Sequence, residues 1–166
     1  YRAVEEMLGA GVDGIFFAPP ALSGERHERL KNLLDQAKIP VVCDGDFGFT
    51  CCGADVSFHY WQGGYIATKH LIECGHRVIG CVAGSSEFVV TNERIKGYRQ
   101  ALEEAGIEFQ QQLVYEGDYS VSSGRDALAY LLGRKVTGIF SFNDEMAFGL
   151  YQSARLYNVK IPDEIS

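Results

Sequence analysis

The chain has 166 residues, of which 46% are hydrophobic and 22% are charged, and its formal net charge is −7. This length suits one ordinary domain or two small lobes, and the composition is that of a soluble globular protein. The excess of negative charge argues against a large phosphate-binding surface, so these residues are not expected to bind DNA tightly. Since no apolar run approaches the roughly 20 residues that span a bilayer, a membrane protein is not expected.

Helical and extended patterns alternate along the first third of the chain. Apolar residues recur at helical spacing at 2–9 and again at 24–38, which predicts two helices. Short apolar runs at 12–17 and 39–43 predict two strands, and a weaker strand is predicted at 54–58. Strands that alternate with helices are typical of parallel sheets with crossover helices.

The same alternation continues through the rest of the chain, and Thr91 or Asn92 is expected to cap the helix that follows the fourth strand. It predicts an α/β fold with doubly wound parallel sheets and right-handed crossovers. In chain order the predicted elements are a helix at 61–73, strand 77–84, a helix from 91 or 92 to about 105, strand 113–115, helix 124–132, strand 139–142 and a final helix that ends near Asn158.

The five cysteines are odd in number and irregularly spaced, which argues against a disulfide framework and fits a reducing cytoplasm. Cys81 lies within an apolar run and is expected to be a small core residue. The histidines lack the spacing of a metal site. Neither a metal nor another cofactor is predicted.

Enzyme signatures are missing from the sequence. It contains no GxSxG nucleophile motif, no Walker A loop and no GxGxxG dinucleotide fingerprint. We therefore predict a protein that binds a ligand without chemistry.

The segment Thr137–Leu150 is the most informative stretch, because an apolar strand runs directly into an amphipathic helix through Asn143 and Asp144. Ligands of open α/β sheets bind outside the carboxyl ends of the strands, which makes both residues candidates for ligand contact. Asn and Asp are also preferred helix caps, and this segment alone favours capping.

Seven stretches together resemble the sugar-responsive lactose-repressor/galactose-repressor (LacI/GalR) family of bacterial transcription regulators, in the family's order and spacing. They cover the chain nearly from end to end. The stretches are VDGIFF, IPVV, GGYIATKHLIECGHRVIGCVAG, NERIKGYRQALEEAGI, EGDYSVSSGRDAL, TGIFSFNDEMAFGLY and VKIPDEIS.

The resemblance implies a periplasmic-binding-protein-like fold, in which two doubly wound parallel-sheet lobes enclose a ligand cleft. Residues 1–58 would form part of the N-terminal lobe and residues 59–166 most of the C-terminal lobe. The chain is expected to be a piece of a longer protein, because the helix-turn-helix domain of the family has no counterpart in it.

The function implied by the resemblance is effector binding that controls a bacterial DNA-binding regulator, usually a repressor. The effector would be a sugar or sugar phosphate, and the regulator a cytoplasmic homodimer that binds operator DNA through the domain outside this chain. Two alternatives stay open: a regulator that responds to a purine or nucleoside, and a periplasmic-type sugar-binding protein of a transport system.

The resemblance also implies which residues line the ligand site. Arg94 matches an arginine that points into the cleft of similar regulators, where its fork of donors can span adjacent hydroxyls. Tyr119 matches an aromatic that stacks on the ligand, and Phe88 replaces a polar residue of some members. Asn143 matches a residue that contacts the effector, whereas Asp144 is the better candidate for a cap or a supporting contact.

One acidic residue of the family's cleft falls in the turn after the IPVV stretch. Here Asp44 and Asp46 flank the expected position, which is occupied by Gly45. Either carboxylate could take the role. The pair lacks the further ligands that a metal ion would need.

Overall fold

The computed structural model describes residues 2–18, 25–44, 54–56 and 58–166, and the side chains of 26, 27, 44, 54 and 55 are not described. The chain divides into two compact units, Tyr1–Phe58 and His59–Ser166. Each unit holds its own parallel three-stranded sheet and its own apolar core.

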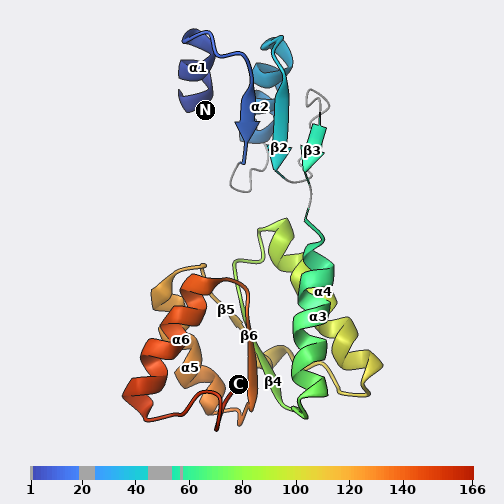
Figure 1. The fold of residues 1–166 in the computed structure, drawn as a ribbon, viewed down its shortest axis with the longest axis vertical. Coiled ribbons are helices and arrows are strands. Elements are labelled where there is room, and N and C mark those ends of the chain that lie inside the picture. The colour runs from blue at the N-terminus through green and yellow to red at the C-terminus, as the bar shows by residue number, and fades with distance from the viewer. Residues whose placement is uncertain (1, 19–24, 45–53, 57) are drawn as a thin grey trace. The chain divides into compact units, whose positions relative to one another are not determined.

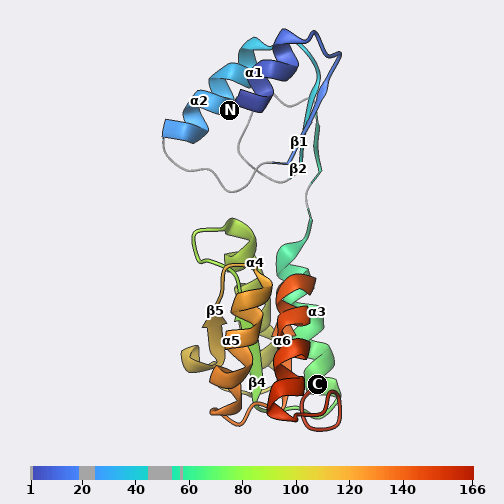
Figure 2. The same ribbon diagram turned by 90° about the vertical axis from the view of Figure 1, so that its left-hand side faces the viewer.

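The first unit packs two helices on one side of its sheet, as Figure 2 shows. Its strands pair in parallel in the order β1-β2-β3. Leu30 and Leu34, one helical turn apart, are buried against Ile15 and Val41 of the sheet. The elements are α1 (Arg2–Gly9), β1 (Ile15–Phe17), α2 (Glu25–Gln36), β2 (Val41–Asp44) and β3 (Ala54–Val56).

The second unit is a three-layer α/β arrangement with strand order β5-β4-β6, all parallel. Helices α3 and α4 cover one face of this sheet, and α5 and α6 cover the other (Figure 1). The elements are α3 (Tyr60–Glu73), β4 (Ile79–Ala83), α4 (Val89–Glu104), the 3-10 turn η1 (Gln111–Leu113), β5 (Val114–Glu116), α5 (Val121–Leu132), β6 (Gly138–Ser141) and α6 (Asp144–Tyr157).

Strand β4 forms the centre of the second core, and all five of its residues are buried. Such a short continuous apolar run is typical of a parallel strand that is covered on both faces. Cys81 is fully buried in this strand, as predicted, and burial raises the pKa of its thiol. Tyr98 of α4 packs on the same core and donates its hydroxyl to the Ile79 carbonyl oxygen at 2.8 Å.

Helices α3 and α4 touch backbone to backbone. A Cβ atom placed on Gly64 would lie 2.2 Å from the carbonyl oxygen of Arg94, and one on Gly97 would lie 2.0 Å from that of Trp61. Since real Cβ atoms do not approach a carbonyl so closely, only glycine permits this packing at either position. The close contact fixes the backbone of Arg94 against α3.

The predicted starts of two helices are wrong. Helix α4 begins at Val89, and its N-cap residue Phe88 has no side-chain cap bond, so neither Thr91 nor Asn92 caps it. Both residues lie inside the helix, where their side chains form bonds outside it. Helix α5 begins at Val121, ahead of the predicted residue 124, because the hydroxyl of Ser120 accepts a bond from the Ser123 amide.

The cysteines of the described segments are not all free thiols. Cys74 and Cys81 are free, but Cys43 in β2 is disulfide-bonded. The expectation drawn from cysteine number and spacing is therefore wrong at Cys43. Cys51 and Cys52 lie outside the described residues. None of the helices in the described segments is long and apolar enough to cross a membrane.

Candidate functional site

The second-unit candidates gather at the carboxyl edge of the β5-β4-β6 sheet. Phe88 follows β4, Tyr119 follows β5 and Asn143 follows β6, and parallel strands bring these three segments to the same edge. The segment after β4 leads to α4 on one face, whereas the segment after β6 leads to α6 on the other (Figure 1). Adjacent strands whose connections leave to opposite faces mark the topological switch point where open α/β sheets bind ligands.

Tyr119 is held in an unusual backbone conformation. Its φ of 68° lies in the left-handed region, which is rare for a bulky side chain and costs free energy unless neighbouring contacts impose it. The Asn143 Nδ2 atom donates to the Tyr119 carbonyl oxygen at 2.9 Å, and the Asp118 carboxylate accepts from the amide of Ser120 at 3.0 Å. These bonds on either side of Tyr119 stabilise the turn that carries it.

The hydrogen bonds to the Asp118 carboxylate also stabilise its ionised form. The hydroxyl and the amide of Ser120 lower the pKa of the Asp118 carboxyl, because both donate to its ionised form. The turn before α5 is therefore most stable with this carboxylate charged.

The ring of Tyr119 packs directly on Gly84, the residue after β4. A Cβ atom on Gly84 would lie 1.9 Å from Cε2 of this ring, so the ring occupies the space that any other residue would need. Phe88 meets the ring edge to face, with centroids 5.8 Å apart. The two rings form an aromatic corner at the sheet edge, which suits an apolar ligand face.

Arg94 joins α4 to the end of β6. Its Nη1 atom donates to the Phe142 carbonyl oxygen at 2.6 Å, and its guanidinium lies 5.4 Å from the ring centre of Tyr60 and 5.7 Å from that of Phe142. Among the described residues the side chain makes no other hydrogen bond, so further N–H donors of its fork are available to a ligand. Arg94 lies in the second turn of α4, away from the positive end of the helix dipole.

Asn143 is the N-cap of α6, and Asp144 is not. The Asn143 Oδ1 atom accepts from the Met146 amide at 3.0 Å, and its extended backbone is that of an N-cap residue. Asp144 is already the first residue of the helix and is exposed. The expectation that Asp144 is the better cap is therefore wrong, while ligand contact by either residue stays a prediction.

The acidic candidates of the first unit are described only in part. Asp44 is the last residue of β2, where its backbone pairs with Val56, and its side chain is not described. Asp46 lies outside the described residues. A cleft role for either carboxylate stays a prediction. In the described part of the chain, no group of three or more His, Cys, Asp or Glu residues could hold a metal ion.

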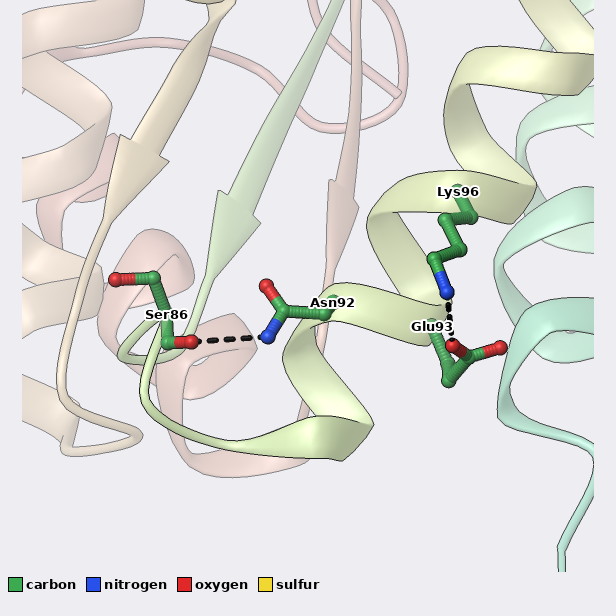
Figure 3. A network of polar contacts seen from close by, with 4 residues as sticks. All are labelled: Ser86, Asn92, Glu93 and Lys96. Atoms are coloured by element: carbon green, nitrogen blue, oxygen red, sulfur yellow. Dashed lines mark hydrogen bonds and ion pairs between the residues drawn. The ribbon is translucent and has the colours of Figure 1, made fainter.

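Sequence reasoning missed a set of polar contacts that secure the loop after β4. The Glu116 Oε1 atom accepts from both the amide and the hydroxyl of Ser86, each at 2.9 Å, and the Asn92 Nδ2 atom donates to the Ser86 carbonyl oxygen at 2.9 Å. Figure 3 shows the bond between Asn92 and Ser86. We call Ser86, Asn92 and Glu116 the loop latch.

The loop latch has an electrostatic consequence. The amide and hydroxyl of Ser86 lower the pKa of the Glu116 carboxyl, because both donate to its ionised form.

The ion pair of Lys96 with Glu93, also drawn in Figure 3, lies on the surface of α4 and contributes little stability.

The sequence predicts Thr91 only as a possible helix cap, but its side chain contacts Tyr119. Thr91 is only 2% exposed, and its Oγ1 atom shares a 2.7 Å hydrogen bond with the hydroxyl of Tyr119. The pairing joins residues 28 positions apart, so no local pattern could have shown it. A threonine on the buried side of an amphipathic helix was the available signal.

Comparison with known proteins shows the family. The family model of periplasmic binding proteins and the sugar-binding domain of the LacI family matches residues 1–166. The HTH-type transcriptional regulator DegA of Bacillus subtilis is 35% identical over 93% of this chain and 46% of its own length. The chain thus spans about half the length of this curated relative.

Solved structures agree with this assignment. The transcription regulator CcpA of Lactococcus lactis matches with a TM-score of 0.83 and 33% identity, over 99% of this chain and 59% of that one. A LacI family transcriptional regulator of Enterococcus faecium with bound ribose matches with a TM-score of 0.82 and 29% identity, over 98% and 60%. The α/β fold of the periplasmic-binding-protein type, predicted from the sequence, is confirmed. The chain belongs to the family of periplasmic binding proteins and LacI-type sugar-binding domains.

Proposed function

We propose that this chain is the greater part of the effector-binding domain of a LacI-type transcription regulator. Residues 1–58 would be part of its N-terminal lobe and residues 59–166 most of its C-terminal lobe. The observation that carries the proposal is the edge of the β5-β4-β6 sheet, where the aromatic corner of Phe88 and Tyr119 and the guanidinium of Arg94 all lie at the topological switch point.

The effector is a small polyhydroxylated molecule, a sugar or a sugar phosphate. A sugar presents an apolar face that stacks on an aromatic ring and hydroxyls that accept from a guanidinium. The relative from Enterococcus faecium was solved with bound ribose, which supports this class. A purine or nucleoside is the second candidate, because the rings of Phe88 and Tyr119, whose planes meet at 66°, offer aromatic surface to a flat ligand.

The regulator would act in the cytoplasm as a homodimer that binds operator DNA through a segment outside this chain. The relative DegA is an HTH-type regulator, which supports a DNA-binding partner domain. Helix α6 exposes Phe148 and Tyr151, three residues apart on one face, and such an aromatic strip suits a contact with a second copy. The net charge of −7 keeps these residues themselves away from DNA.

The site serves binding rather than catalysis, and the matched relatives named above are regulators. The rival is a periplasmic-type sugar-binding protein, since the family model includes that class. The two differ at the N-terminus of the full-length protein: a helix-turn-helix identifies a regulator and a signal peptide identifies a transport component.

A thermal-shift screen of the full-length protein tests the proposed function. The screen would include D-ribose, cellobiose, ribose 5-phosphate and inosine. Since a ligand that binds only the folded state raises the unfolding temperature, at least one sugar or sugar phosphate is expected to do so. Stabilisation by inosine alone would move the assignment to the nucleoside class. No stabilisation by any compound, with turnover of one of them, would contradict the proposal.

A further inference from the structure

We infer that Thr91 is a positioning residue of the effector site, which sets affinity by fixing the ring of Tyr119. The inference rests on the proposed function and adds a residue to it. Thr91 itself is buried and would not touch the effector; its Oγ1 atom holds the hydroxyl of Tyr119 at 2.7 Å.

The Tyr119 ring packs against the apolar core of the second unit, but such apolar contacts do not fix the direction in which its hydroxyl points. Its backbone is in the left-handed region, which does not favour a bulky residue. The ring lies on Gly84, which offers a flat backbone surface and no side chain to clasp it. Phe88, the half-buried N-cap residue of α4, meets it only edge to face. The hydroxyl of Thr91 is therefore the one directional contact described for the ring.

Thr91 is suited to the role because its own position is rigid. It lies inside α4, where its amide donates to the Phe88 carbonyl oxygen at 3.1 Å. A β-branched side chain in a helix has few rotamers available. The same helix carries Arg94, so one rigid element positions both the Tyr119 ring of the aromatic corner and the guanidinium of Arg94. Preorganised groups cost less to order when a ligand binds, which raises affinity.

The first part of the test needs no ligand. Full-length protein labelled with [13Cζ]tyrosine gives one carbon signal for each tyrosine, and the signal of Tyr119 is the one lost in Tyr119→Phe. Thr91→Val, which keeps shape but removes the hydroxyl, is expected to shift this signal. Thr91→Ser should restore it, because it returns the hydroxyl. An unchanged Tyr119 signal in Thr91→Val would overturn the inference.

Thr68→Val is the matched control. Thr68 is equally buried and its hydroxyl donates to the Gly64 carbonyl oxygen at 2.8 Å, but this bond lies within α3. The control therefore loses one buried hydroxyl bond of similar length without touching Tyr119, and its Tyr119 signal should stay in place.

The second part measures binding of D-ribose, cellobiose and inosine by calorimetry. Thr91→Val is expected to weaken whichever compound binds by about fivefold, the effect of one hydrogen bond, and Thr68→Val by less than about twofold. Tyr119→Phe should weaken it by a similar factor, and adding Thr91→Val to Tyr119→Phe should change little, because both remove the same bond.

The outcomes separate the two proposals. If a compound binds Thr91→Val as tightly as the wild type, the positioning role is wrong while the proposed function stands. If none of the three compounds binds the wild type, the proposed function fails for these ligand classes, and the carbon signal alone decides whether Thr91 fixes the ring.

Discussion

Arg94 makes one bond to the Phe142 carbonyl oxygen and has further donors to offer, so its effect on ligand binding should exceed its effect on folding. Replacing it with Ala removes charge-assisted hydrogen bonds, each worth about 1.5–3 kcal/mol, and effector affinity should fall at least about tenfold. Calorimetric titration of the compound found in the thermal-shift screen measures this change.

Arg99→Ala is the control for Arg94→Ala. Arg99 lies on the same helix but is exposed, with its guanidinium 4.2 Å from the ring centre of Phe109. It should change effector affinity by less than about twofold, since a distant surface charge is screened by salt. If the Arg94→Ala and wild-type proteins bind the effector equally well, Arg94 does not contact the effector and has only a structural role.

Glu116 should make the stability of the loop latch depend on pH. Its pKa is lowered in the folded state, so its contribution is present above the unfolded value of 4.5 and is lost as the pH falls through the folded value. Glu116→Gln keeps an acceptor but removes the charge. Urea unfolding should show a less stable variant at about pH 7 and a smaller difference from the wild type at about pH 3.

Glu103→Gln serves as the control for this pH effect. Glu103 is exposed on α4, and its carboxylate makes no hydrogen bond to any described residue. Its removal should leave stability unchanged at both pH values. A Glu116→Gln variant that differs from the wild type by the same amount at both would show that charge has no part in the latch.

Helix α3 offers a sharp test of the packing that positions Arg94. Adjacent glycines differ there: a Cβ on Gly64 would lie 2.2 Å from the Arg94 carbonyl oxygen, whereas one on Gly63 meets nothing within 4 Å. Gly64→Ala must push the helices apart and should cost about 1–3 kcal/mol. Gly63→Ala should be neutral or stabilise by up to about 1 kcal/mol, because Ala favours helix.

Urea unfolding of both glycine variants measures these free energies. Helix propensity alone would make the two substitutions equivalent. A Gly64→Ala protein as stable as Gly63→Ala would therefore contradict the close contact between α3 and α4.

The sequence predicts each α-helix and strand of the described structure, but it misses the 3-10 turn η1 and predicts the starts of the helices less well. Local periodicity is enough to identify β4 and the buried side of α4, where Tyr98 and Leu102 face the core. The predicted start of α4 is wrong because Thr91 and Asn92 are residue types that cap helices, but here their side chains bond to other residues. Thr91 bonds to Tyr119, and Asn92 bonds to Ser86. Such tertiary contacts override a local preference and leave no local trace.

The candidate site shows the same limit. Motif resemblance named Phe88, Arg94, Tyr119 and Asn143, and the structure places all four on segments at one sheet edge. The resemblance could not show that the side-chain amide of Asn143 is hydrogen-bonded at both of its polar atoms. Its oxygen accepts from the Met146 amide, and its nitrogen donates to the Tyr119 carbonyl oxygen. Nor could the resemblance find the loop latch, since Ser86 and Glu116 lie 30 residues apart.

At the scale of the whole molecule, the proposed function requires that effector binding alter a second activity in another part of the protein. A ligand between two lobes changes DNA affinity only if it prefers one lobe arrangement over another. The 166-residue chain carries a net charge of −7, which opposes a DNA-binding surface. Under the proposed function it would therefore supply the effector site, and a segment outside it would make the DNA contact.

A mobility-shift titration tests the central claim most directly. It would compare the full-length protein and this 166-residue chain on an operator duplex recovered by selection with the full-length protein, at fixed salt, with and without the stabilising compound. The account predicts that the full-length protein binds with an affinity that the compound changes and that the chain alone does not bind. Specific binding by the chain alone, or full-length affinity that ignores the compound, would contradict it.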